Sequence, residues 1–195
     1  MAELKLPVGE DAIRELTVGD YLELSGRMIT GRDAAHKWLM EGRREEVAPF
    51  LEGSVIYHCG PVVRHNPDGT WDFVAAGPTT SIREEPYQAD VIARYGLRGV
   101  IGKGGMGPKT LDGMMKSGAV YLHAIGGAAQ VLARAVKKVE RVFMLEEFGV
   151  PEALWVIQVE RFPVVVTMDS HGGSLHDEVE QTSGRRLREL VGLEP

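Results

Sequence analysis

Residues 99–107, with the sequence GVIGKGGMG, combine three glycines at the spacing G-x-G-x-x-G with a single lysine, Lys103. An apolar run precedes this loop and the helical pattern PKTLDGMMKSG follows it, which is the strand-turn-helix context of a dinucleotide-binding turn. Glycines let the backbone approach a bound anion closely, and the N-terminus of a helix attracts negative charge. The loop therefore indicates an anion site, with a plain tight turn and a solvated lysine as the simpler alternative.

Two features count against a dinucleotide in this loop. A dinucleotide-binding unit needs an acidic residue about 20 positions further on, at the end of the next strand, to hold the ribose hydroxyls. No Asp or Glu occurs between Asp112 and Glu140. The phosphate motif G-x-x-x-x-G-K-[ST] does not match either, because Lys103 precedes a glycine pair and is not followed by Ser or Thr. A small anionic ligand fits Lys103 better.

Two further loop-to-helix junctions carry arginines. The segment AAGPTTSIREEPY, residues 75–87, contains Arg83, and the segment MITGRDAAH contains Arg32. Loops of this kind at the ends of strands are where α/β sheets usually bind ligands. Two guanidinium groups and the ammonium group of Lys103 suit a small dicarboxylate, because each carboxylate accepts a bidentate guanidinium.

The hydroxyl groups in the segment 75–87 have a simpler interpretation as helix caps. Thr80 or Ser81 is a candidate N-cap, with Glu84 or Glu85 completing a capping box. This alternative accounts for one hydroxyl and leaves Arg83 unexplained. Arg32 alone is equally consistent with a charged residue in the first turn of a helix.

Composition limits the class of protein. The 195 residues are 44% hydrophobic, which suffices for one substantial core, so we expect a single domain over residues 1–195. The net charge of -6 argues against nucleic acid and anionic membranes as partners. The charged first segment, MAELKLPVGEDAIREL, lacks the apolar region of a secretory signal, so we expect a soluble cytoplasmic protein.

The single cysteine, Cys59, excludes an internal disulfide and an iron-sulfur cluster built by this chain alone. Its apolar neighbours favour a small buried side chain over a nucleophile. The histidines His36, His58, His123 and His171 lack the spacing of metal ligands, so we expect no metal site. The segment MDSHGGS has its Ser, His and Asp too close in sequence for a catalytic triad and is interpreted as a turn.

Strand and helix patterns alternate in the middle of the chain, and both flanks are richer in strands. The sequence therefore predicts an α/β fold with a mixed sheet. The expected helices lie at 32–43, 84–96, 107–118, 126–139 and 174–190, the last interrupted near Gly184. The expected strands include 54–60, 70–77, 97–102, 119–124, 141–147, 154–160 and 162–170.

Six motifs, in this order, resemble the β subunit, equivalent to the C-terminal domain, of class I fumarate hydratases and L(+)-tartrate dehydratases. They are SGRMITGRDAAHK, YHCGPVV, AAGPTTSIR, GVIGKGGMG, GAVYLHAIGGAA and VTMDSHGGSL. Each motif alone is weak, but the ordered set is specific and spans residues 25–175. The loop GKGGMG is similar to that of the two-subunit enzymes rather than the single-chain ones.

The resemblance implies a three-layer, swivelling β/β/α domain that closes over an active site shared with a separate α subunit. In this family the α subunit carries three cysteines and a [4Fe-4S] cluster, whose open iron coordinates the substrate. It implies reversible hydration of fumarate to L-malate, with L(+)-tartrate dehydration as the alternative, and an α2β2 assembly. A non-enzymatic anion- or nucleotide-binding domain and a purely structural swivelling module are the alternatives from other classes.

The resemblance also assigns roles to individual residues. The proposed base of the family falls on Thr79, the first threonine of PTTSIR. The substrate-binding positions fall on Arg32, Thr80, Arg83, Lys103 and Gly104.

Overall fold

The computed structural model describes residues 2–192. Its strands are β1 (Ala2–Leu6), β2 (Tyr21–Thr30), β3 (Val55–Tyr57), β4 (Val62–His65), β5 (Trp71–Ala75), β6 (Gly99–Gly102), β7 (Val120–His123), β8 (Val136–Phe143) and β9 (Leu154–Met168). Its helices are α1 (Glu10–Arg14), α2 (Asp33–Met40), α3 (Ala48–Leu51), the 3-10 helix η1 (Ser81–Glu84), α4 (Glu85–Tyr95), α5 (Pro108–Ser117), α6 (Ala129–Ala135), α7 (Leu145–Phe148) and α8 (Leu175–Val191).

Seven strands form one mixed sheet in the order β1-β2-β3-β6-β7-β9-β8, and an additional pairing of β2 with β9 closes part of it into a ring. Strands β2, β3, β6 and β7 run parallel, whereas β9 is antiparallel to both β7 and β2. The expected α/β class with a mixed sheet is thus confirmed. The closed ring of β2, β3, β6, β7 and β9 was not expected from the sequence.

Alternate residues of the ring strands face two separate apolar cores. In β3, Val55 and Tyr57 belong to the core inside the ring, while Ile56 belongs to the core beneath the helices. The same alternation separates Ile101 from Val100 in β6. This period of two explains why the short strands are apolar throughout, since both of their faces are buried.

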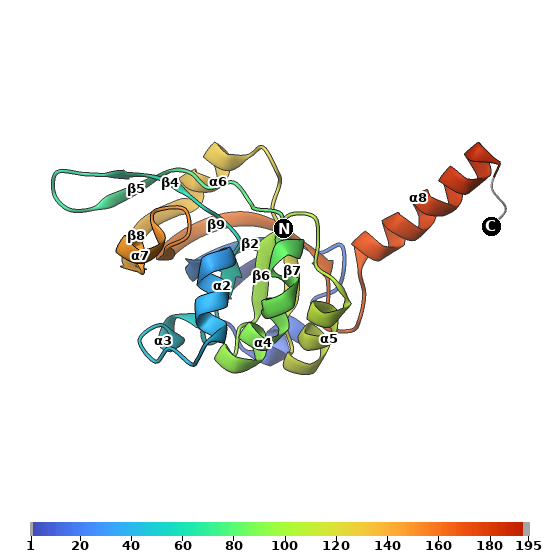
Figure 1. Ribbon diagram of the computed structural model, residues 1–195, viewed down its shortest axis with the longest axis horizontal. Helices are drawn as coiled ribbons and strands as arrows, with labels where there is room; N and C mark the ends of the chain where they lie inside the picture. Colours follow the sequence, from blue (N-terminus) through green and yellow to red (C-terminus); the bar gives the residue numbers. More distant parts are fainter. Residues whose placement is uncertain (1, 193–195) are drawn as a thin grey trace.

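Helices α2, α4 and α5 cover the outer face of the ring (Figure 1). Their buried side chains, including Leu39, Ile92 and Met114, pack in the second core. Helices α2 and α5 directly follow the parallel strands β2 and β6, whereas the β4–β5 hairpin and η1 separate β3 from α4. Isolated bridges of Pro78 with Cys59 and of Thr80 with Lys103 bring the segment after β5 back to the carboxyl ends of β3 and β6. The loops that carry the predicted site residues lie at this edge.

The structure corrects the expected elements in the second half of the chain. The expected strands 154–160 and 162–170 are one continuous strand, β9, which bends where Arg161 adopts a left-handed conformation with φ 52°. Residues 136–139, expected to end a helix, begin β8 because they pair with β9. The last helix, α8, runs through Gly184 without the expected interruption.

Helix α8 points away from the sheet and its covering helices (Figure 1). Among the described residues, no helix is both long enough and apolar enough to cross a membrane.

Candidate functional site

The residues assigned by resemblance lie on three loops at the carboxyl ends of the parallel strands. Arg32 follows β2 and precedes α2, and Lys103 directly follows β6. Thr79 and Thr80 precede η1, which contains Arg83. The short loops between strand and helix therefore position all of these groups at one edge of the ring.

The loop that contains Thr79 and Thr80 (the threonine loop) pairs through its backbone with the loop that contains Lys103 and Gly104 (the lysine loop). The N–H of Lys103 donates to the carbonyl of Thr79 at 3.2 Å, and the N–H of Ser81 donates to the carbonyl of Lys103 at 3.0 Å. The N–H of Thr79 donates in turn to the carbonyl of His58 at 2.6 Å. A Cβ on Gly104 would lie 3.9 Å from Thr80 Cγ2. These contacts bring Thr79, Thr80, Lys103 and Gly104 together.

The two arginines meet at one carboxylate. Arg83 Nη2 lies 3.0 Å from Asp33 Oδ2, and Arg32 Nη2 lies 3.9 Å from the same oxygen. Arg32 Nε also lies 3.4 Å from Glu152 Oε1. This contact is not a hydrogen bond, and Arg32 Nε has no hydrogen-bond partner among the described residues. Because the ion pair of Arg83 is 46% exposed on both sides, an incoming carboxylate can replace Asp33 at little cost.

Lys103 stands apart from the acidic groups. Among the ion pairs formed by residues 2–192, none uses its ammonium group. Its side chain is half-buried and extends past Gly126, where an added Cβ would lie 3.6 Å from Lys103 Cδ. The ammonium group of Lys103 is therefore available for contact with a ligand.

The glycines of this loop are required by both conformation and space. Gly104 and Gly105 have φ angles of +84° and +78°, a region that other residues rarely adopt. A Cβ on Gly105 would lie 2.5 Å from the ring of His176, and one on Gly102 would lie 1.8 Å from Ser81 Oγ. The loop is thus a tight turn that packs closely against its neighbours.

The N-terminus of α5, where a dinucleotide phosphate would bind, is already occupied by a carboxylate of the chain. Glu85 accepts hydrogen bonds from the N–H of Gly107 at 2.8 Å and the N–H of Thr110 at 3.1 Å. The Thr110 hydroxyl donates to Glu85 as well, at 2.6 Å. This contact satisfies the helix N-terminus and argues against a nucleotide there. It also replaces the expected capping box, since neither η1 nor α4 has a side-chain cap.

A buried network of hydrogen-bonded polar side chains lies beneath the three loops, and it was not predicted from the sequence. The Tyr121 hydroxyl donates to Ser81 Oγ at 2.8 Å, and Ser81 Oγ lies 2.9 Å from His58 Nδ1. His58 Nε2 is 2.8 Å from Gln88 Oε1, and His36 Nε2 is 2.9 Å from the same oxygen. All five residues are buried. This network connects β7, η1, the end of β3, α4 and α2, so it fixes the loops relative to one another.

Burial keeps His36 and His58, the two histidines of this network, neutral. It lowers the pKa of His36, and it lowers that of His58 well below the ordinary value, with the neighbouring His36 adding to the effect. The imidazoles are 5.0 Å apart in a T-shaped arrangement. His36 was expected to cap or pack within its helix; it does pack there, and it also bonds to Gln88. The sequence offered one signal for the network: His58 stands in the otherwise apolar strand segment SVIYHCG.

Glu84 is a buried carboxyl group beside the arginines. Neither of its oxygens has a hydrogen-bond partner among residues 2–192, and Oε2 lies 3.7 Å from His36 Nδ1. Burial raises the pKa of Glu84 to about 7; the Asp33 carboxylate raises it further and Arg83 opposes the rise. When Glu84 is protonated, it provides no negative charge beneath Arg32 and Arg83 to neutralise their guanidinium groups.

The remaining candidates have structural roles. Cys59 is buried, as expected, and burial raises the pKa of its thiol to about 12, so it is no nucleophile. The segment MDSHGGS is a turn, as interpreted, in which Asp169 accepts the N–H groups of His171, Gly173 and Val18. Within residues 2–192 no three His, Cys, Asp or Glu side chains form a metal-binding group.

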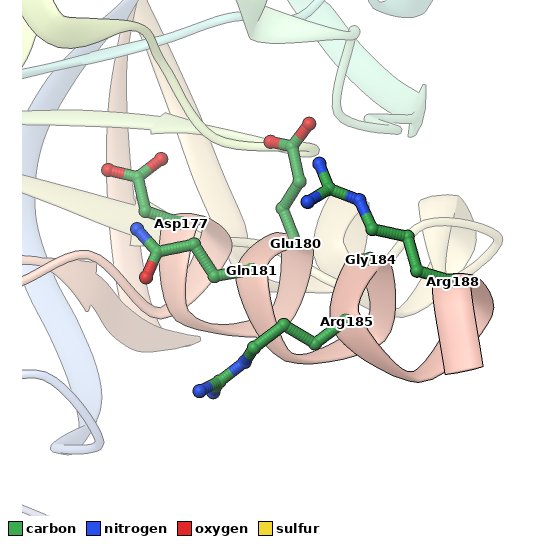
Figure 2. A pocket seen from close by; sticks show the side chains of 6 residues that line it. All are labelled: Asp177, Glu180, Gln181, Gly184, Arg185 and Arg188. Carbon is green, nitrogen blue, oxygen red and sulfur yellow. The ribbon is translucent and has the colours of Figure 1, made fainter. Parts of the chain in front are cut away.

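A separate surface hollow lies on α8, away from these loops (Figure 2). All of the residues that line it belong to this one helix: Asp177, Glu180, Gln181, Gly184, Arg185 and Arg188. It is an open helix surface and plays no part in the candidate site.

Comparison with known proteins identifies relatives that match most of this chain. The family model described as "Fumarase C-terminus" matches residues 2–179. A protein named "Putative fumarate hydratase class I" from Geobacillus stearothermophilus is 52% identical over 187 residues, covering 96% of this chain but 36% of the relative. A "Putative L(+)-tartrate dehydratase subunit beta" from Methanocaldococcus jannaschii is 41% identical, covering 93% of this chain and 94% of the relative. The "L(+)-tartrate dehydratase subunit beta" of Escherichia coli (strain K12) is 38% identical, covering 96% and 92%. The chain thus spans about a third of the first relative and nearly all of the other two.

The contact between Gly102 and Ser81 gives a stability prediction. In Gly102→Ala the new methyl group would overlap Ser81 Oγ, so we expect a loss of about 1 to 3 kcal/mol in the free energy of unfolding. Urea denaturation measures it. Gly42→Ala is the control, since a Cβ there meets nothing within 4 Å. Equal stability of the two variants would show that Ser81 is not packed against β6.

The buried Glu84 gives a pH-dependent prediction. The unfolded chain releases this proton near pH 4.5 and the folded chain near pH 7, so Glu84 makes the protein progressively less stable as the pH rises between these values. Glu84→Gln removes the effect. We expect its free energy of unfolding, relative to the wild type, to increase by on the order of 2 kcal/mol from pH 5 to pH 8.

The control for this experiment is Glu46→Gln, the same change at an exposed position. Its stability relative to the wild type is expected to stay constant over this range. If Glu84→Gln behaves in the same way, burial does not raise the pKa of Glu84 and the assignment is wrong.

Proposed function

Since the chain belongs to the Fumarase C-terminus family, we propose that it is the β subunit of a two-subunit hydro-lyase that interconverts fumarate and L-malate. The observation that carries this proposal is the convergence of Arg32, Arg83 and Lys103 at one edge of the parallel strands. Two guanidinium groups and an ammonium group can bind the two carboxylates of a four-carbon dicarboxylate.

The electrostatics of the site suit the chemistry of hydration and dehydration. Removing a proton from the carbon next to a carboxylate builds negative charge on that carboxylate. Preorganised positive groups stabilise the charge as it develops. Arg83 bound to one carboxylate oxygen and Lys103 to another would provide this stabilisation, with Arg32 orienting the substrate. Thr80 and Gly104 line the same place and would contact the substrate.

Thr79 is the proposed base. Its backbone N–H donates to the carbonyl of His58 and its carbonyl accepts from the N–H of Lys103, so the backbone of Thr79 is held next to that of Lys103. A threonine hydroxyl is a weak base at its ordinary pKa and needs an acceptor for its own proton. We assign that acceptor to the partner subunit.

The partner also carries the cofactor in this proposal. The donor set of this chain does not fit a [4Fe-4S] cluster, because its one cysteine is buried with a raised pKa and no metal-binding group occurs within residues 2–192. We therefore place the cluster on a cysteine-bearing α subunit in an α2β2 assembly. The name "subunit beta" of two relatives supports such a partner. We further propose that the domain swivels as a three-layer unit to close on it.

L(+)-tartrate is the alternative substrate, supported by the names of the Methanocaldococcus and Escherichia relatives. Fumarate takes precedence because the Geobacillus relative is 52% identical and is named for fumarate. A single hydroxyl group separates malate from tartrate. Comparing kcat/KM for fumarate, L-malate and L(+)-tartrate on one preparation decides between them.

We expect Arg83→Ala and Lys103→Ala each to lower kcat/KM for fumarate by about 10² or more, because each removes a charge that stabilises the transition state. The measurement uses the chain assembled with its cysteine-bearing partner and an anaerobically reconstituted cluster. Melting temperatures should change little, since neither side chain is part of the core.

Lys116→Ala is the matched control. Its lysine lies in the last turn of α5, pairs with Asp112 and is 73% exposed, so its removal should leave kcat/KM unchanged. Wild-type kinetics in Arg83→Ala or Lys103→Ala would refute that residue's role. An assembled, cluster-loaded wild type without activity on any of the three acids would refute the proposed function.

A further inference from the structure

His176, in the first turn of α8, connects this helix to the domain. Among the side chains of residues 175–191, it is the one that is not exposed. Its Nε2 lies 3.0 Å from Thr167 Oγ1 in β9, and its ring packs edge-to-face on the ring of Tyr121 in β7, with 5.9 Å between the centroids. The rest of the helix projects away from the domain (Figure 1). The contacts of His176 therefore fix the place where α8 begins.

The same imidazole lies against the lysine loop. A Cβ added to Gly105 would lie 2.5 Å from Cδ2, 2.6 Å from Cγ and 2.9 Å from Nε2 of His176. These three are its nearest atoms outside the adjacent residues, so the ring covers the side of Gly105 on which other residues carry a side chain. Gly105 is two residues after Lys103, the lysine of the candidate site. Helix α8 thus begins with a residue that contacts a loop of this site.

The lysine loop needs support at this point. Gly104 and Gly105 have φ angles of +84° and +78°, and two successive glycines give the backbone more freedom than other residues would. The threonine loop holds the start of the lysine loop through two backbone hydrogen bonds. Further along, the N–H of Met106 donates to Met168 Sδ at 3.4 Å, and a thioether is a weak acceptor. The ring of His176 therefore restrains the loop where its own backbone is most flexible.

We propose that His176 is a positioning residue for Lys103. Its imidazole supports the lysine loop at Gly105, so the place of the ammonium group depends on the first turn of α8. The role of Lys103 in this inference rests on the proposed function, whereas the support of the loop is a property of this chain alone. The two parts can therefore be tested separately.

The surroundings of His176 favour a neutral ring in a fixed orientation. Burial lowers the pKa of His176, and the neighbouring His123, whose ring centroid is 6.1 Å away, lowers it further, while Asp177 opposes the shift. Burial lowers the pKa of His123 as well. A neutral imidazole can pack on Gly105 and bond to Thr167 without placing an uncompensated buried charge beneath the loop.

The alternative is that His176 only anchors α8 through Thr167, and two variants separate the two roles. His176→Ala removes both the ring and the bond to Thr167. His176→Phe keeps an aromatic ring against Gly105 and loses the bond. If the ring supports the loop, the Phe variant retains the order of the loop and the Ala variant loses it. If His176 is only an anchor, the two variants behave alike.

The first measurement is the backbone order parameter of Gly104 and Gly105, from NMR relaxation of the full chain. A rigid backbone gives about 0.85, and we expect His176→Ala to lower the value to about 0.6 or below, with His176→Phe near the wild type. His171→Ala serves as the control, because His171 Nε2 lies 2.8 Å from the carbonyl oxygen of Arg14 and not at the lysine loop. Circular dichroism verifies the fold of each variant, which should persist because His176 belongs to neither apolar core.

The second measurement is the kinetics of the chain assembled with its cysteine-bearing partner. We expect His176→Ala to lower kcat/KM for fumarate about tenfold, mainly in kcat, because Lys103 stabilises charge that develops in the transition state and a displaced lysine does so less well. His176→Phe should recover most of this loss, and His171→Ala should match the wild type.

Unchanged order parameters in His176→Ala, or an equal loss in His176→Phe, would overturn the support of the loop. A wild-type kcat/KM for His176→Ala in an active assembly would overturn its role in positioning Lys103. A wild-type assembly without activity on fumarate, L-malate or L(+)-tartrate would instead refute the proposed function, and the order parameters would still decide whether His176 holds the loop.

Discussion

The hydroxyl of Ser81 connects the parts of the candidate site. This hydroxyl accepts a hydrogen bond from the hydroxyl of Tyr121 in β7 and contacts Nδ1 of His58 at the end of β3. The backbone N–H of Ser81 donates to the carbonyl of Lys103. This geometry depends on Gly102, because a Cβ there would occupy the place of the hydroxyl. Three strands, the threonine loop and the lysine loop are thereby held in one arrangement, and the closed ring of strands keeps their ends from separating.

The charge distribution follows from burial beneath this arrangement. His36 and His58 are neutral because their imidazoles are buried, and burial favours the protonated form of Glu84. The layer below the arginines thus carries less negative charge below about pH 7 than a glutamate with the ordinary pKa would give it. At the surface, Asp33 is the acidic group that Arg32 and Arg83 share. A ligand carboxylate that takes its place would meet two guanidinium groups already oriented, and Lys103 beside the threonine loop.

The local features of the site could be predicted from the sequence, whereas its long-range features could not. Glycines and prolines mark the turns, so the placement of Lys103 and Arg83 at strand-to-helix junctions was predictable from spacing. The pairing of Glu85 with Gly107 spans 22 residues, and a local capping box was the only partner that the sequence suggested. The contact of His58 with Gln88, and the pairing of β9 with β2, likewise depend on how distant segments pack. Residues 136–139 were assigned to a helix because their pattern continues that of α6, and the sheet overrides this preference.

A crystal structure of the assembled protein with L-malate would show whether Arg83 and Lys103 bind a substrate carboxylate. We expect a carboxylate of L-malate within hydrogen-bond distance of both Arg83 and the Lys103 ammonium group, with Asp33 displaced from Arg83. L-malate bound elsewhere, with the pair of Arg83 and Asp33 intact at 3.0 Å, would contradict it.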